Sequence, residues 1–427
     1  MGRYHRRRRK PCGFKRPLPV LEMLMSHCRP LALNDVLRGA AWPVAALLAM
    51  FLSACGGGGG GGAPDPGGIP AAFSKVTLDT RLYPDARCND GTPAVFYIQA
   101  GVGSSASAPA SRTVIGLQGG GYCLSDAECR GRSSDLTSSS GYPASIVPEG
   151  LLSSTDSNPT FRSWNRVRVP YCSSDFYSGD AGPTGGSTNF QFRGAKIVQA
   201  VIATLNSRYG IGKAGDTVLL AGTSAGAVGA FINANRVRSA LPGATVLTLI
   251  DAGVYPDVAP PRPGTPPRES VRDLGVIGLS YWNGQPDADC IAANPSAPSL
   301  CYLFEHAAPT LATPFFVLQN AIDLVGVANV GLLPADADLS DPVLQAWLRD
   351  TYLPAMGGIL SRVGVTSGQG VFGVCASPQL HTQSSQNAVW TAPVAALGDV
   401  SPQAAVAGWV GSGAAATQYL APACSPG

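Results

Sequence analysis

Histidine is scarce in this chain of 427 residues: there are four, and two of them, His5 and His27, precede residue 55. Only His306 and His381 remain in the body of the protein to act as a base or as an imidazole ligand. No two cysteines form a Cys-x-x-Cys pair either. Because zinc sites need closely spaced Cys and His ligands, the sequence predicts no metal site, and nothing in it implies a cofactor.

Clustered positive charge is missing after residue 54. The formal net charge is +3, but residues 1–54 contain ten of the 30 Lys and Arg and only two of the 27 Asp and Glu. The remainder has 20 basic and 25 acidic residues, a net charge of −5. Binding to nucleic-acid phosphates needs concentrated Lys and Arg, so nucleic acid is excluded as a partner.

The N-terminal apolar run, Ala40–Leu52, is too short to span a bilayer comfortably. It follows a basic cluster at Arg6–Lys10 and leads into Leu52-Ser53-Ala54-Cys55, which matches a bacterial lipobox. We therefore expect a lipoprotein signal peptide over residues 1–54 and lipidation at Cys55. The alternatives are a buried helix, or a plain signal peptide followed by a chance cysteine.

Seven consecutive glycines follow Cys55. Segment 55–75 is therefore expected to form a flexible Gly- and Pro-rich tether to a catalytic domain at residues 76–427. The protein would then be an exported bacterial lipoprotein, attached to a membrane through its N-terminal lipid. Gly56 stands where an Asp is associated with inner-membrane retention, which favours the outer membrane.

Eight of the eleven cysteines lie beyond residue 55. An even number in an oxidising compartment predicts four disulfides. Eight cysteines allow 105 pairings, and the residues alone do not choose among them. The eight are Cys88, Cys123, Cys129, Cys172, Cys290, Cys301, Cys375 and Cys424.

Short apolar runs alternate with helical segments from about residue 71 onward. Arg193–Leu205 repeats apolar residues at spacings of three and four, which predicts an amphipathic helix. Other runs have strand length and are often apolar on both faces, as a covered parallel sheet requires. We therefore expect an α/β fold with a mostly parallel central sheet flanked by helices, and a loop near the site at Pro256–Pro267. The expected strands are Val95–Ile98, Val114–Leu117, Val167–Val169, Val218–Leu220, Val246–Ile250 and Phe315–Leu318.

The strongest local signal is Gly222-Thr-Ser-Ala-Gly226, which directly follows one of these apolar runs. A sharp strand-to-helix turn of this kind lifts a serine hydroxyl above the sheet, and the small flanking residues let the backbone turn. The start of the following helix supplies free N–H groups where negative charge develops. The pattern predicts Ser224 as a nucleophile; a structural serine in a glycine turn is the alternative.

A serine nucleophile needs a base, because its hydroxyl reacts poorly at neutral pH. In α/β-hydrolases the acid follows the serine and the histidine comes last. His381 fits this order, whereas His306 fits only if the acid follows it. Asp323, which follows an apolar strand, is favoured as the acid. Asp251 is the competitor, with binding of nearby backbone N–H groups as its alternative role.

A glycine run, Gly119-Gly120-Gly121, follows the expected strand at Val114–Leu117. Glycines allow backbone N–H groups to approach a tetrahedral oxyanion closely. A tight turn of permissive residues is the alternative. Together with the serine turn, the run favours an oxyanion hole.

These features belong to a set of seven short motifs in fixed order. Together they resemble the pectin acetylesterase and Notum family, over about residues 88–383. The motifs are Cys88-Asn-Asp-Gly-Thr-Pro, Gln118-Gly-Gly-Gly-Tyr-Cys123, Ser163-Trp-Asn-Arg-Val-Arg-Val-Pro-Tyr-Cys172, Phe192-Arg-Gly, Gly222-Thr-Ser-Ala-Gly, Asp251-Ala-Gly and His381-Thr-Gln.

The resemblance implies an α/β-hydrolase fold with Ser224 as nucleophile, Asp323 as acid and His381 as base. It also implies an oxyanion hole and particular disulfides. Implied oxyanion donors are the N–H groups of Gly120, Gly121 and Ala225. Implied disulfides are Cys88–Cys172 and Cys123–Cys129, which leave Cys290 with Cys301 and Cys375 with Cys424.

The function implied by this family is that of a carboxylesterase, which removes acetyl groups from pectin or, in Notum, a fatty acyl group from a signalling protein. We expect a serine carboxylesterase acting on acyl esters, with acetyl esters of a polysaccharide or a small ester as substrate. Two alternatives stay open. One is a peptidase or thioesterase with the same triad, and the other is a non-catalytic surface-binding lipoprotein.

Overall fold

The computed structural model describes residues 68–105, 110–183, 190–262, 271–334, 337–377, 379–422 and 424. All of them belong to one compact unit. The expected signal peptide, Cys55 and most of the tether lie outside the described residues, so the boundaries at 54 and 75 stay predictions. Within the described part of the chain, no helix has the length and apolar character needed to cross a membrane.

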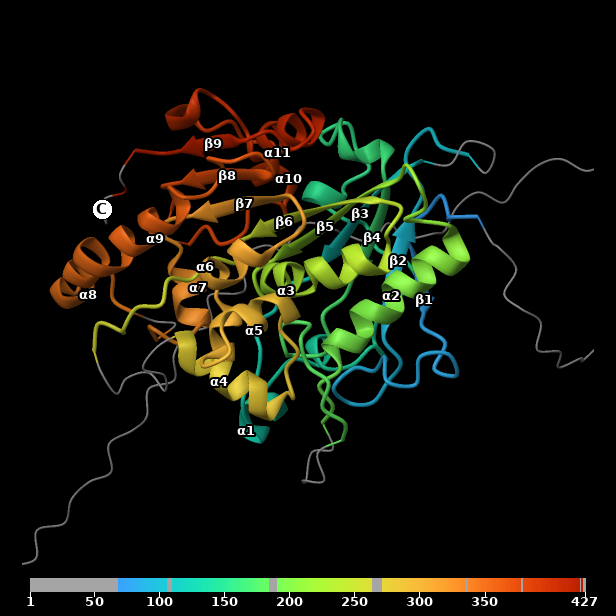
Figure 1. The fold of residues 1–427 in the computed structure, drawn as a ribbon, viewed down its shortest axis with the longest axis horizontal. Coiled ribbons are helices and arrows are strands. Elements are labelled where there is room, and N and C mark those ends of the chain that lie inside the picture. The colour runs from blue at the N-terminus through green and yellow to red at the C-terminus, as the bar shows by residue number, and fades with distance from the viewer. Residues whose placement is uncertain are drawn as a thin grey trace, which may run out of the picture. The chain divides into compact units, whose positions relative to one another are not determined.

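A nine-stranded sheet runs through this unit in the order β1-β2-β4-β3-β5-β6-β7-β8-β9 (Figure 1). Strand β2 is antiparallel to both of its neighbours, and every pair from β4 to β9 is parallel. The sheet is therefore mostly parallel, as the sequence predicts. The strands are β1 (Ser74–Thr77), β2 (Val95–Gln99), β3 (Arg112–Leu117), β4 (Asn165–Val169), β5 (Thr217–Thr223), β6 (Thr245–Asp251), β7 (Phe315–Asn320), β8 (Gln369–Val374) and β9 (Thr417–Leu420).

Helices connect these strands and cover the sheet (Figure 1). The α-helices are α1 (Asp126–Arg130), α2 (Gly194–Tyr209), α3 (Ala225–Ala240), α4 (Val271–Tyr281), α5 (Ala288–Ala293), α6 (Phe304–Ala307), α7 (Leu324–Asn329), α8 (Pro342–Trp347), α9 (Leu353–Leu360), α10 (Asn387–Trp390) and α11 (Pro402–Gly411). Short 3-10 segments are η1 (Ser134–Leu136), η2 (Gly150–Leu152), η3 (Phe161–Ser163), η4 (Pro298–Tyr302), η5 (Ala308–Thr310) and η7 (Ala395–Leu397), and η6 (Leu348–Tyr352) is a π turn.

Both faces of the sheet are buried, which explains why its strands are continuous apolar runs. In β5, Val218 and Leu220 pack into the core shared with α2 and α3. The alternate residues, Leu219 and Ala221, pack into a second core with Trp390 of α10 and the α11 side chains. Strand β5, which leads into the turn at Ser224, is therefore packed on both faces.

The structure confirms the six expected strands and the helix, which runs one turn further, to Tyr209. Strands β1, β8 and β9 are not anticipated: β1 and β9 have four residues each, and Gly370 and Gly373 interrupt the apolar pattern of β8. Residues 256–262 of the proline-rich segment form no helix or strand, and 263–267 lie outside the described residues.

The two disulfides implied by the family resemblance are present, and so are the two that were left by elimination. Their Cα–Cα distances are 4.9, 5.1, 5.8 and 5.5 Å, within the usual range for a disulfide. They pair Cys88 with Cys172, Cys123 with Cys129, Cys290 with Cys301, and Cys375 with Cys424.

Candidate active site

Ser224 occupies the turn between the end of β5 and the start of α3. Its backbone has φ 54° and ψ −122°, a conformation that L-residues rarely adopt. The turn is tight enough to exclude side chains on both sides: a Cβ on Gly222 would lie 1.9 Å from the oxygen of Gly226, and a Cβ on Gly226 would lie 2.2 Å from the oxygen of Leu117. The geometry is that of a nucleophile elbow.

Asp323 and His381 come together although 58 residues separate them. Asp323 Oδ2 lies 2.6 Å from His381 Nδ1, and the carboxylate is 1% exposed. The other oxygen, Oδ1, accepts the N–H of Gly326 at 2.8 Å, which makes Asp323 the N-cap of α7. One oxygen of the carboxylate is thus held by the first turn of α7, and the other faces the imidazole.

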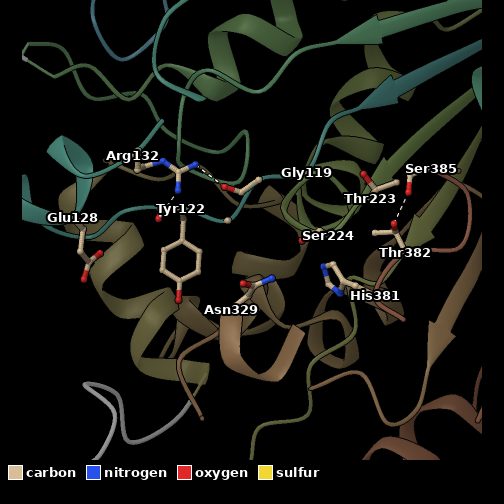
Figure 2. Close-up of a pocket in the computed structure, with 12 residues that line it drawn as sticks. Gly119, Tyr122, Glu128, Arg132, Thr223, Ser224, Asn329, His381, Thr382 and Ser385 are labelled. Carbon is tan, nitrogen blue, oxygen red and sulfur yellow. Dashed lines mark hydrogen bonds between the residues drawn. The ribbon is translucent and has the colours of Figure 1, made fainter. Parts of the chain in front are cut away.

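The second ring nitrogen of His381 is the one available for chemistry. Nε2 is buried and has no hydrogen-bond partner among the described residues. His381 and Ser224 line the same cavity, and Figure 2 shows the imidazole beside the serine. With Nδ1 bound to Asp323, Nε2 is left to accept a proton.

The glycine run packs directly against the elbow. A Cβ on Gly119 would lie 2.6 Å from the oxygen of Thr223 and 2.9 Å from the Cβ of Ser224. Gly120 and Gly121 have φ values of 146° and 68°, in the region that favours glycine. Close approach at Gly119 and backbone conformation at Gly120 and Gly121 therefore both require glycine, and the loop lies directly against the turn that carries Ser224.

Arg132 holds this loop in place, a role that the sequence does not reveal. Its guanidinium donates to the carbonyl of Gly120 at 2.6 Å and to that of Tyr122 at 3.0 Å. Because the C=O and N–H of a trans peptide point in opposite directions, the first bond directs the Gly121 N–H away from the guanidinium. Burial lowers the pKa of Arg132. The only signal in the sequence is that Arg132 lies three residues after Cys129. Cys129 forms a disulfide with Cys123, which directly follows the glycine run and Tyr122.

Ala225 is the first residue of α3, so its N–H is one of the helix-start donors without an intrahelical acceptor. It adjoins Ser224, as the oxyanion prediction requires. His306, in contrast, lies on α6 and does not line the cavity that Ser224 and His381 share.

Asp251, the competing acid, does not bind the imidazole. Its carboxylate accepts the backbone N–H groups of Gln383 and Ser384 at 2.7 to 3.0 Å and the Ser384 hydroxyl at 2.6 Å. Burial raises the pKa of Asp251 to about 6, and these hydrogen bonds oppose the rise. The alternative role anticipated for this residue, binding of nearby N–H groups, is the one that the structure has.

The cavity in front of Ser224 has a volume of about 630 Å³. The turn at Ser224, the glycine run and the loop of His381 all contribute to its lining (Figure 2). Within the described residues no group of three or more His, Cys, Asp or Glu could hold a metal ion. The lining residues are Gly119, Gly120, Gly121, Tyr122, Glu128, Arg132, Thr223, Ser224, Asn329, His381, Thr382 and Ser385.

Known proteins with similar sequences include enzymes from animals and plants. The palmitoleoyl-protein carboxylesterase Notum of Drosophila melanogaster is 33% identical over 291 residues, which is 64% of this chain and 40% of that protein. Pectin acetylesterase 7 of Arabidopsis thaliana is 27% identical over 396 residues, 84% of this chain and 92% of its own length. The chain thus spans about half or less of the length of the animal relatives and most of the length of this plant relative.

The fold has a solved counterpart. A 1.9 Å structure of the Wnt deacylase Notum from Drosophila aligns with a TM-score of 0.68 and 26% identity, covering 83% of this chain and 99% of that one. The likeness supports the α/β-hydrolase fold expected from the elbow.

The relatives also correct one expectation. The predicted localisation, a bacterial lipoprotein attached to the outer membrane, is wrong by this comparison: the matching curated proteins are Notum carboxylesterases and plant pectin acetylesterases, not bacterial lipoproteins. The lipobox pattern at Cys55 is a match of four residues, too short to outweigh a relationship that extends over most of the chain.

The relationship itself rests on most of the chain. The family model described as Pectinacetylesterase matches residues 71–419, a range that includes the elbow, the glycine run, Asp323 and His381. The chain therefore belongs to the pectinacetylesterase family.

Proposed function

We propose that this protein is a serine carboxylesterase that hydrolyses short acyl esters. His381 Nε2 takes the proton of the Ser224 hydroxyl as the serine oxygen attacks the ester carbonyl. The carbonyl oxygen becomes an oxyanion, stabilised by the N–H groups of Gly120, Gly121 and Ala225. His381 then gives the proton to the leaving alcohol, and an acyl-serine remains.

The second half repeats these roles with water. His381 removes a proton from water, the resulting hydroxide attacks the acyl-serine, and the Ser224 oxygen leaves with the proton that His381 returns. Asp323 accepts the hydrogen bond of Nδ1–H, which fixes the tautomer, and stabilises the imidazolium. The observation that carries the proposal is the 2.6 Å Asp323–His381 contact at a cavity lined by the elbow serine.

The walls of the cavity favour a short acyl group on a polar alcohol. None of the lining side chains that the structure describes is Val, Leu, Ile, Met or Phe. A long fatty chain gains about 0.8 kcal/mol for each buried CH₂ only where apolar walls receive it. Polar side chains line it instead, among them Asn329, Thr382 and Ser385. We therefore propose an acetylated carbohydrate as the substrate class, with small acetyl esters as surrogates.

The test is turnover by the purified protein and its Ser224→Ala variant, with Ser361→Ala, an exposed serine remote from the cavity, as the matched control. We expect Ser224→Ala to lower kcat for p-nitrophenyl acetate by a factor on the order of 10⁶. It should also abolish labelling by a fluorophosphonate. Full turnover by Ser224→Ala would disprove the proposal.

A substrate panel separates the alternatives. Acetate release is measured from acetylated pectin and acetylated xylan, and p-nitrophenyl acetate is compared with the palmitate ester, a thioester and an amide. Preference for the thioester or the amide would identify a thioesterase or a peptidase with the same triad. Absence of both turnover and labelling would identify a non-catalytic binding protein.

A further inference from the structure

Asp251, in the Asp251-Ala-Gly motif, contacts both Ser224 and the segment that follows His381, although it has no role in the proposed triad. Asp251 is the last residue of β6, next to β5 in the sheet, and its side chain is fully buried. Its main-chain oxygen accepts the N–H of Ser224 at 2.8 Å. The end of β6 therefore fixes the backbone of the nucleophile.

The carboxylate of the same residue fixes the other side of the site. Residues 381–386 belong to no helix or strand, so no regular ladder holds the base. Asp251 Oδ2 instead accepts three donors, the N–H groups of Gln383 and Ser384 at 2.9 and 2.7 Å and the Ser384 hydroxyl at 2.6 Å. Gln383 is only two residues beyond His381. The carboxylate of Asp251 therefore fixes the backbone from which the imidazole side chain extends.

The contacts are specific for an ionised carboxylate. An ionised carboxylate has acceptor sites on both oxygens and no donor. An amide in its place would turn an NH₂ group toward one of the loop N–H groups or leave a buried N–H without an acceptor. An unsatisfied buried donor is costly, and the loop would move to reach another acceptor or water.

We propose that Asp251 is a positioning residue that sets the distance between the nucleophile and the base. Its main-chain oxygen holds Ser224, and its carboxylate holds the loop of His381. The inference rests on the proposed function of these two residues. Asp251 acts through His381 rather than on the substrate, because Asp323 already occupies Nδ1 of the imidazole.

The first test is Asp251→Asn, compared with Asp216→Asn as the matched control. Asp216 is also a buried carboxylate that accepts two loop N–H groups, those of Gly212 and Lys213, but it lies at the opposite end of β5. A displacement of about 1 Å between reacting groups can lower a rate about 100-fold. We expect Asp251→Asn to lower kcat for p-nitrophenyl acetate about 10- to 100-fold with KM within about threefold, and Asp216→Asn to keep kcat.

The second test asks whether the effect passes through His381. In a His381→Ala background the loop no longer carries a base, so adding Asp251→Asn should change the residual rate by less than about twofold. A merely structural role would lower the rate by the same factor in both backgrounds, and that result would overturn the proposal. So would a wild-type kcat in Asp251→Asn.

Hydrogen–deuterium exchange provides a readout that is independent of turnover. In Asp251→Asn the amides of Gln383 and Ser384 should exchange faster, while those of α3 keep their protection; unchanged exchange at the two amides would contradict the proposal. If Asp251→Asn does not fold, Ser384→Ala carries the test. It removes one donor to the carboxylate and should lower kcat about 2- to 10-fold, again only when His381 is present. Loss of activity in Ser224→Ala together with full activity in both of these variants would refute the positioning role and leave the proposed function intact.

Discussion

Replacement of Asp323 by Asn tests the assignment of the acid and separates it from Asp251. The substitution retains the shape of the side chain, and the Asn oxygen can still accept the N–H of Gly326 as the cap of α7. The amide NH₂ group then faces Nδ1 of His381 in place of the oxygen now 2.6 Å away. Two N–H groups cannot face each other, so the imidazole adopts the tautomer with its proton on Nε2.

That tautomer cannot accept the proton of Ser224. Loss of the correct tautomer lowers kcat by about 10⁴-fold in serine hydrolases, which corresponds to about 5.5 kcal/mol of transition-state stabilisation. The fold should change little, because the helix cap survives; Asp323→Ala would lose about 1 kcal/mol more of stability through the cap. Activity and stability are therefore expected to separate in the Asn variant.

The assay is kcat for p-nitrophenyl acetate, corrected for the fraction of protein that folds, with thermal unfolding measured on the same samples. Asp251→Asn is measured in parallel and should lose about 10- to 100-fold. A loss below about tenfold in Asp323→Asn, or a larger loss in Asp251→Asn than in Asp323→Asn, would refute the assignment of Asp323 as the acid.

Three further predictions concern the surroundings of the site. Arg132→Lys keeps the charge but cannot hold two loop carbonyls in the same geometry, so kcat should fall about 10- to 100-fold through the misplaced oxyanion donor; a kcat within twofold of wild type would contradict this. Since burial raises the pKa of Asp251 from 3.8 to about 6, the folded state binds this proton more tightly than the unfolded chain. The resulting stability is fully present below about pH 4 and is lost as the pH rises through 6. In urea unfolding, the stability of the wild type relative to Asp251→Asn should therefore fall by about 2.4 kcal/mol from pH 4 to pH 7, and a constant difference would contradict the raised pKa of Asp251. Joint replacement of Cys88 and Cys172 by Ser opens a link across 84 residues and should lower the free energy of unfolding by about 4 kcal/mol, measured by urea unfolding at neutral pH.

The sequence predicts most of the central sheet and the principal chemical groups because these depend on local patterns. Apolar runs buried on both faces predict β2 to β7, and the glycines around Ser224 predict the elbow because no other residue fits there. Histidine is scarce, and only His381 comes late enough in the chain to be the predicted base. Chain order also favours Asp323 as the predicted acid. The strands that are missed, β1, β8 and β9, are short or contain glycines, and their stability comes from neighbours in the sheet.

The sequence by itself predicted Ser224 as the nucleophile and the order of its partners along the chain, and its family motifs implied two of the four cysteine pairs and left the other two by elimination. Chain order only favoured Asp323, and the tertiary structure showed that Asp323 contacts His381 whereas Asp251 binds the N–H groups of Gln383 and Ser384. It also revealed Arg132, whose hydrogen-bond acceptors are carbonyls 10 and 12 residues away. Hydrogen bonds between distant segments leave no periodic pattern in a sequence, and a single chain therefore shows them only when it is folded.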